Sequence, residues 1–177
     1  ADAVRDALID MLAKIADDNN ISSVHATFCT EAEWKRFGAR GWLLRLGQQY
    51  HWSNAGYRTF DDFLAALSAN RRKTIKRERR DAQADLDIRV LTGADITEAH
   101  WDAFFAFYMD TGSRKWGRPY LTRQAFSLLG ERMAEQILLV LAYADGHPIA
   151  GAINFIGKDA LYGRYWGALV EKPFLHF

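Results

Sequence analysis

The sequence has little cysteine and little proline, and each shortage narrows the classes of protein to which the chain can belong. One cysteine, Cys29, among 177 residues excludes an internal disulfide framework and fits a reducing compartment, so we expect a cytoplasmic protein. Three prolines and 13 glycines are too few for a collagen-like or low-complexity chain. No apolar run approaches the ~20 residues that cross a bilayer, so we expect no membrane span.

Several chemical motifs are also missing. Neither G-x-x-x-x-G-K-[ST] nor G-x-G-x-x-G occurs, so nothing indicates a nucleotide phosphate loop. H-E-x-x-H and C-x-x-C are absent and the five histidines are scattered, so we expect no metal site. His25 and Cys29 lie four residues apart on an expected strand, where a Cys–His nucleophilic pair is one interpretation. We favour the other, a half-buried cysteine at the end of a strand.

The apolar residues that are present, 49% of the chain, exclude disorder and divide the sequence into expected elements. Apolar spacing of three to four residues predicts helices over residues 3–18, 30–37, 59–84, 97–110 and 122–135. Alternation and short apolar runs predict strands over residues 22–28, 42–52 (one strand or a pair), 86–92, 137–144, 148–156 and 160–168. Thr30 with Glu33 forms a capping box, and Thr59 with Asp62 forms a variant of it.

The last three strands are separated by short turns. Asp145-Gly146 lies between the first two and is a strong hairpin signal, and residues 157–159 separate the second from the third. These turns predict a C-terminal three-stranded antiparallel meander. The fold class is therefore α/β (α+β), a mixed sheet flanked by helices.

The net charge of +1 conceals one strongly basic segment, NRRKTIKRERR at residues 70–80, with seven Lys or Arg and one Glu. One interpretation is a solvated helix face, because runs of charge commonly are. The segment is alternatively a binding site for the phosphates of a large anionic ligand, such as tRNA or a lipid-linked diphosphate, or it docks on an acidic surface. The candidate anion-binding residues are Arg71, Arg72, Lys73 and Lys76.

The final strand, LYGRYWG, carries an arginine between aromatic residues. A period of two predicts that Tyr162, Arg164 and Trp166 share one face. A buried arginine is costly unless it is paired, so Arg164 points into a wet cleft or meets a carboxylate. These three residues are our first candidates for substrate binding.

The loop at residues 112–120 interleaves cationic and aromatic side chains. Arg114, Lys115 and Trp116 are suited to stacking on a planar ring while holding a phosphate, and they are further candidates for substrate binding. The alternative is a loop that Trp116 pins to the sheet. His176 is a candidate general acid or base, and a structural histidine is the alternative.

Several of these runs together resemble a known family. They are SSVHATF (22–28), LRLGQQYHW (44–52), FDDFLAAL (60–67) with the basic segment that follows it, DTGSRKWGRPYLT (110–122), and LYGRYWG with PFLHF (161–177). They resemble the FemAB-like branch, peptidoglycan biosynthesis/recognition, of the GNAT acyltransferase superfamily. The resemblance covers essentially the whole chain.

The resemblance implies parts of two tandem GNAT-like lobes. Residues 1–57 are similar to the second half of a first lobe and residues 58–177 to the first part of a second, so we expect the chain to be truncated at both ends. Fem transferases add amino acids from aminoacyl-tRNA to peptidoglycan precursors, and other GNAT relatives use acyl-CoA. The coiled-coil arm of some Fem transferases and the glycine-rich turn of CoA-dependent relatives are both absent from these residues, so the donor stays open.

Three hypotheses follow. The first is a transferase that moves an acyl or aminoacyl group from acyl-CoA or aminoacyl-tRNA to an amine, such as that of a cell-wall precursor. The second is a non-catalytic module whose basic helix, residues 70–84, binds an anionic partner. The third is part of a larger assembly that is completed by oligomerisation or by exchange of segments with a second copy.

Overall fold

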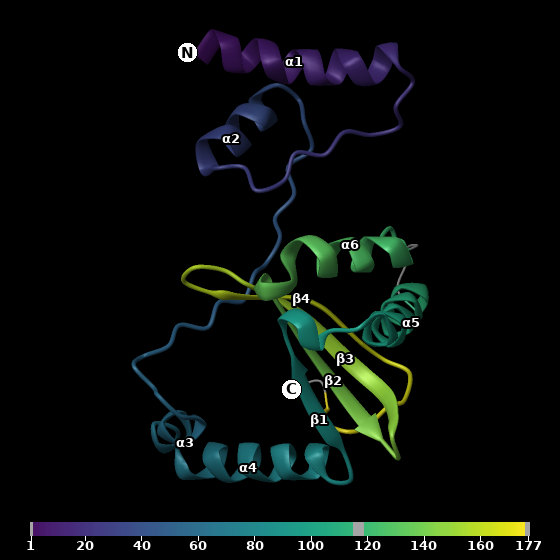
Figure 1. Cartoon of the computed structure of the whole chain (residues 1–177). Coiled ribbons are helices and arrows are strands. Elements are labelled where there is room, and N and C mark those ends of the chain that lie inside the picture. Colours follow the sequence, from purple (N-terminus) through teal and green to yellow (C-terminus); the bar gives the residue numbers. More distant parts are fainter. Residues whose placement is uncertain (1, 115–118, 176–177) are drawn as a thin grey trace. The chain divides into compact units, whose positions relative to one another are not determined.

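The computed structural model describes residues 2–114 and 119–175, and the chain forms two compact units, Ala1–Ala55 and Gly56–Phe177. Whether these units are parts of two tandem lobes stays a prediction. The N-terminal unit holds helices α1 (Asp2–Asp18) and α2 (Glu31–Ala39), labelled in Figure 1.

Helix α2 begins at the predicted capping box, which is confirmed: the Thr30 side chain accepts from the backbone N–H of Glu33, and the Glu33 carboxylate accepts from that of Thr30. Ion pairs hold α2 to α1. Arg36 lies 2.7 Å from Asp6, and Arg40 pairs with Asp10.

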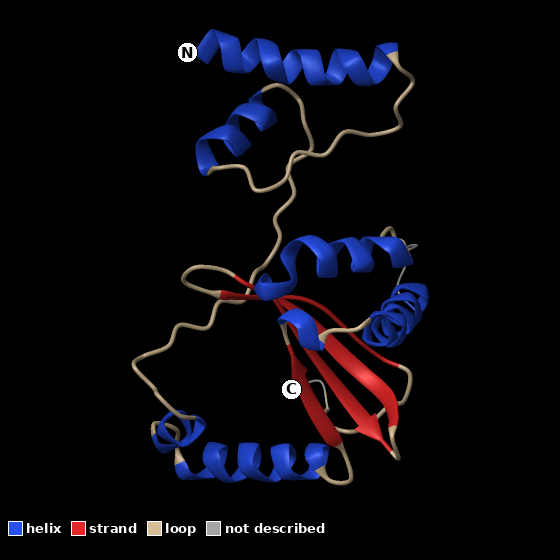
Figure 2. Cartoon of the chain, in the orientation of Figure 1, coloured by secondary structure: helices blue, strands red, loops and turns tan. Residues whose placement is uncertain are grey.

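The two strands predicted in this unit are wrong. Residues 21–30 and 42–55 are irregular, as the loop colouring in Figure 2 shows. Phe28 has a φ of +59°, which ends any extended run there. An alternating pattern makes a strand only where another strand pairs with it, and no described strand pairs with these segments. Their apolar side chains consequently face solvent, with Leu43 and Leu46 94% and 88% exposed.

The C-terminal unit contains a four-stranded sheet, which confirms the predicted α+β class and the meander. Its strands are β1 (Asp87–Leu91), β2 (Ile137–Ala144), β3 (His147–Ile156) and β4 (Leu161–Ala168), in the order β1-β2-β3-β4. Each of the three pairings is antiparallel, so the parallel pair that a mixed sheet would add does not occur among the described strands. Asp145 and Gly146 both have positive φ, as a tight two-residue hairpin requires.

Helices α5 (Glu98–Arg114) and α6 (Arg123–Met133) cover one face of this sheet (Figure 1). Short 3₁₀ turns, Gly93–Asp95 and Ala134–Gln136, precede α5 and β2. The core under the helices is almost wholly apolar and includes Trp101, Phe104, Phe107, Phe126, Leu139, Leu141 and Ile153. At Gly167 of β4 an added Cβ would lie 2.4 Å from the Phe107 carbonyl oxygen, so the missing side chain lets β4 approach α5.

The single helix predicted over residues 59–84 is wrong, because it is two helices, α3 (Phe60–Ala65) and α4 (Ala69–Gln83). The predicted capping box at Thr59 is confirmed. Where α3 ends, the Arg72 guanidinium donates to the carbonyls of Leu64 and Ala65, which a continuous helix would have bonded internally. The basic segment therefore forms a separate helix.

Candidate functional site

A β-bulge in β4 sets the positions of the candidate substrate residues. Ile153 pairs with Tyr165 and Asn154 pairs with Gly163, so Arg164 is an extra residue in the ladder. The prediction of one shared face for Tyr162, Arg164 and Trp166 is wrong for this reason. Tyr162 pairs with Phe155, which packs against the helix-covered core. Trp166 pairs with Ala152, and both line a groove on the opposite face.

The bulge brings Arg164 against two tyrosines on the helix-covered side of the sheet. Arg164 Nη2 donates to the hydroxyl oxygen of Tyr120 over 2.8 Å, and its guanidinium carbon lies 4.3 Å from the ring centroid of Tyr165. The hydroxyls of Tyr120 and Tyr165 are bonded to each other. We call these three residues the Arg164 cluster.

The cluster joins the two regions in which the sequence placed candidates, the loop after α5 and the last strand. Sequence reasoning missed Tyr120 and Tyr165 as members. Tyr120 stood in the aromatic and basic loop, and that composition is the signal that could have pointed to it. Tyr165 was assigned to the face away from Arg164 because the alternation was read without the bulge.

Tyr108 of α5 holds the backbone of the loop at Tyr120, one of the three residues of the cluster. Its buried hydroxyl oxygen accepts from the backbone N–H groups of Tyr120 and Leu121, each over 3.1 Å. Its ring packs edge-on against Tyr165, with centroids 5.0 Å apart. Tyr108 thus orders the residues on both sides of the contact between the loop and β4.

The protonation of Tyr165 limits what the cluster does. Burial, helped by the hydrogen bond with Tyr120, raises the pKa of Tyr165 to about 12, although the positive charge of Arg164 acts in the opposite direction. At neutral pH Tyr165 is therefore an uncharged phenol that keeps its proton. It is unsuited to act as a general base there.

Arg114 lies at the other end of β4 and has partners of its own. It belongs to the last turn of α5, not to a loop, and its Nη2 donates to the Ala168 carbonyl over 3.1 Å. The same nitrogen lies 2.5 Å from the Asp110 carboxylate. These contacts tie the end of α5 to β4. Lys115, Trp116 and His176 lie outside the described residues.

The four candidate anion-binding residues of α4 fall into two pairs. Arg72 caps α3, and Lys76 lies 3.8 Å from Asp61. Arg71 and Lys73 are exposed and have no ion pair among the described residues. The structure thus leaves Arg71 and Lys73 available to an outside anion.

The hollow that Trp166 lines, on the sheet face near α4, has a volume of ≈ 290 Å³. Its floor is formed by small or apolar side chains, and Arg79 and Gln83 of α4 lie at its edge. The Arg79 guanidinium also stacks on the Phe60 ring, 4.7 Å from its centroid. Trp166 and Arg164 therefore serve different surfaces of the sheet.

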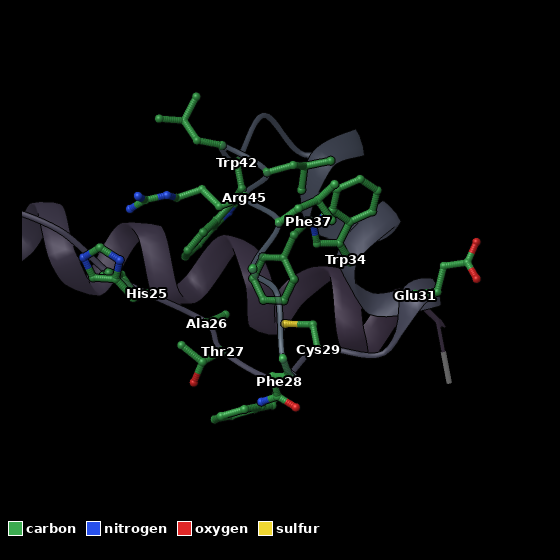
Figure 3. Close-up of a pocket in the computed structure, with 16 residues that line it drawn as sticks. His25, Ala26, Thr27, Phe28, Cys29, Glu31, Trp34, Phe37, Trp42 and Arg45 are labelled. Carbon is green, nitrogen blue, oxygen red and sulfur yellow. The ribbon is translucent and has the colours of Figure 1, made fainter. Parts of the chain in front are cut away.

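A larger hollow of ≈ 750 Å³ lies within the N-terminal unit, between the irregular segments and α2 (Figure 3). Cys29 and His25 both line it. Cys29 is half-buried, as expected, whereas the imidazole of His25 bonds to Ser23 Oγ at 3.1 Å and lies away from the sulfur in Figure 3. Because the imidazole of His25 is bonded to Ser23 and not to Cys29, this surface does not bring a nucleophile and a base together.

In the part of the chain that the structure describes, no three His, Cys, Asp or Glu side chains converge as metal ligands would. No described helix combines the length and apolar character needed to cross a bilayer.

Comparison with known proteins gives one result for the whole chain. A family model described as FemAB-like, peptidoglycan biosynthesis/recognition, matches residues 1–177. No curated protein matches the chain. The family to which the sequence showed a resemblance is thereby confirmed, and the GNAT part of that resemblance stays a prediction.

Proposed function

Because this chain belongs to the FemAB-like family of peptidoglycan biosynthesis and recognition, we propose that it acts as a transferase that moves an acyl or aminoacyl group from an activated donor to an amine. The acceptor would be a cell-wall precursor or a compound derived from one. Acyl-CoA and aminoacyl-tRNA are the two donor classes that fit the resemblance.

The Arg164 cluster is the observation that carries this proposal. Transfer to an amine requires the amine to be held against an activated carbonyl carbon, and it requires donors for the charge that develops on the carbonyl oxygen. The cluster offers a fixed cation and two phenol hydroxyls, of which that of Tyr165 is uncharged, on the solvent side of a packed helix-and-sheet core. We assign Arg164 and Tyr120 to orienting the substrate.

The remaining roles follow from the positions of the candidates. Tyr165 keeps its proton at neutral pH and is not the base. His176 is our candidate for the base, on the sequence alone. Tyr162 extends the same face of the sheet toward the β3–β4 turn, so it would contact substrate further from the reacting atoms.

The test is a transfer assay on the full-length protein. Isotopically labelled acetyl-CoA or aminoacyl-tRNA is incubated with cell-wall precursors, and products are identified by mass spectrometry. Arg164→Ala should lower kcat/KM at least ~10-fold, because a charged hydrogen bond to substrate contributes more than about 1.4 kcal/mol. Arg132→Ala, at an exposed arginine of α6, is the matched control and should leave it unchanged. Equal turnover by the two variants would refute the role of Arg164.

A second candidate function rests on the exposed cations of α4. Arg71, Lys73 and Arg77 have no ion pair among the described residues, and they lie on a helix that could follow a phosphate backbone. Binding of tRNA should then weaken steeply as salt rises, because counterions are released on binding. The double variant Lys73→Gln/Arg77→Gln should reduce that salt dependence. Salt-independent or undetectable binding of tRNA would eliminate this function.

A further inference from the structure

The arginines of the helix-covered sheet differ in what compensates their charge. Arg89 lies 2.7 Å from Asp87, Arg114 lies 2.5 Å from Asp110, and Arg123 lies 2.7 Å from both Glu98 and Asp102. Arg164 is held by a phenol and an aromatic ring and has no carboxylate partner among the described residues. Its guanidinium therefore has oriented contacts, while its charge is not matched by a described carboxylate.

The residues of the adjoining loop that lie outside the described ranges supply no negative charge. Residues 115–118 are Lys, Trp, Gly and Arg, so they contain no acidic side chain that could pair with Arg164. The Tyr165 phenol beside the guanidinium does not compensate the charge either. Tyr165, with its pKa raised to about 12, is neutral at physiological pH.

We propose that the Arg164 cluster is a binding site for a carboxylate, and that the acceptor is an amine carrying a carboxylate group. The binding site is inferred from the Arg164 cluster alone. The identification of its ligand as the acceptor rests on the proposed transferase function. The site would take an amino acid, a peptide with a free carboxyl end, or a related amino acid derivative.

The geometry of the guanidinium suits a carboxylate in particular. A guanidinium presents its N–H groups in a rigid plane that matches the two oxygens of a carboxylate. Stacking on Tyr165 fixes that plane, and the bond from Nη2 to Tyr120 fixes its rotation, so the other N–H groups remain for a ligand. The cost of ordering the side chain has already been met in the unbound protein.

The surroundings favour a single negative charge over a phosphate. One described cation faces the site, and aromatic rings line it. A phosphate dianion bound here would have one described cation for its two charges, whereas a carboxylate would be matched by the guanidinium one to one. The hydroxyl of Tyr120, which is 69% exposed, adds a donor next to the guanidinium for the second oxygen or for a nearby carbonyl.

The experiment is a titration of the full chain observed through the side-chain Nε–Hε signals of ¹⁵N-labelled arginine. The Arg164 signal is identified by its loss in Arg164→Gln. N-acetylglycine is the probe, and its methyl ester, which has the same shape without the charge, is the matched control. We expect N-acetylglycine to shift the Arg164 signal saturably at millimolar concentrations and the ester to leave it in place. Tyr120→Phe should weaken that binding several-fold, and Arg132→Gln should not alter it.

The outcomes separate this inference from the proposed function. An equal response to the ester, no response to the acid, or tighter binding of inorganic phosphate than of N-acetylglycine would overturn the carboxylate site. Saturable binding of the acid with no transfer activity toward any acceptor would retain the site and refute the transferase. Transfer to amines with and without a carboxylate at equal kcat/KM would retain the transferase and overturn the assignment of its acceptor.

Discussion

The two units of this chain are stabilised in different ways. In the C-terminal unit, α5 and α6 cover a sheet face with aromatic side chains that are fully buried, such as Trp101 and Phe104. In the N-terminal unit, charged pairs join α1 to α2, while Val4 and Leu8 of the apolar stripe of α1 are more than half exposed. Both units have the apolar periodicity of folded elements. The difference shows that periodicity forms a core only where a second element presents a matching surface.

The largest effect should come from emptying the core of the C-terminal unit. Phe104 is 0% exposed, so Phe104→Ala should lower the free energy of unfolding by about 3–5 kcal/mol through lost burial and the cavity left behind. Phe28→Ala is the matched change in the other unit, where the ring is 90% exposed, and should alter it by less than about 0.5 kcal/mol. Amide hydrogen exchange of β2 and β3 measures the first effect, and that of α1 and α2 measures the second. Similar effects for the two variants would contradict the contrast between the units.

A smaller effect should follow from filling the close approach between β4 and α5. Gly167→Ala places a methyl group 2.4 Å from the Phe107 carbonyl oxygen and should cost about 1–3 kcal/mol as the strand is pushed away. Gly163→Ala, in the same strand, meets only Asn154 Oδ1 at 3.4 Å and should be tolerated. Urea unfolding of the two variants gives the comparison. Equal midpoints would mean that β4 does not depend on this contact.

Tyr165 of the Arg164 cluster should make the stability of the C-terminal unit sensitive to alkali. The pKa of Tyr165 is raised to about 12 from 10.0, so the unfolded chain loses this proton at lower pH than the folded one does. Its contribution is fully present below pH 10 and is lost as the pH rises toward 12, an effect on the order of 2 kcal/mol. Tyr165→Phe should flatten the unfolding free energy over that range. If the unfolding free energy of Tyr165→Phe fell with pH as steeply as that of the unsubstituted protein, another group would be responsible for the sensitivity to alkali.

The smallest effect should come from the ion pairs of the N-terminal unit. The hydrogen bond with Arg40 lowers the pKa of Asp10 below its ordinary value of 3.8. This contribution is present above pH 3.8 and is lost as the pH falls through the lowered value. Arg40→Gln should remove that dependence of the N-terminal unit's stability on acid and much of its dependence on salt. Circular dichroism of the helices follows both. The C-terminal unit serves as the internal control, since Arg40 pairs with Asp6 and Asp10 of the N-terminal unit and Arg40→Gln should leave the acid and salt dependence of the C-terminal unit unchanged.

Much of the C-terminal sheet could be predicted from the sequence because its signals are local. The Asp145-Gly146 turn and the apolar runs on both sides of it specify the hairpin without reference to distant residues. The strands predicted at 22–28 and 42–52 failed because pairing depends on a partner that alternation does not reveal. The bulge at Arg164 was equally invisible, since an extra residue is defined only by the register against β3.

The candidate site could be predicted in part for the same reason. Composition pointed to Arg164 and to the loop that contains Tyr120, but these residues are 44 apart in the sequence and meet only through the tertiary packing of α5. Tyr108 gave no signal at all, because a buried tyrosine that accepts two backbone N–H groups is indistinguishable in sequence from any core aromatic residue.

The extra residue in β4 also bears on how the molecule tolerates insertions and deletions. A bulge absorbs an offset of one position, so the strand segments on its two sides are aligned independently of each other. The tip of the β3–β4 hairpin, residues 157–160, can then vary in length while Gly167 stays seated on α5. A deletion of Arg164 itself would instead leave a regular ladder, with Tyr162 still opposite Phe155 and Tyr165 still opposite Ile153, so it would remove the cation and keep the aromatic residues on their present side.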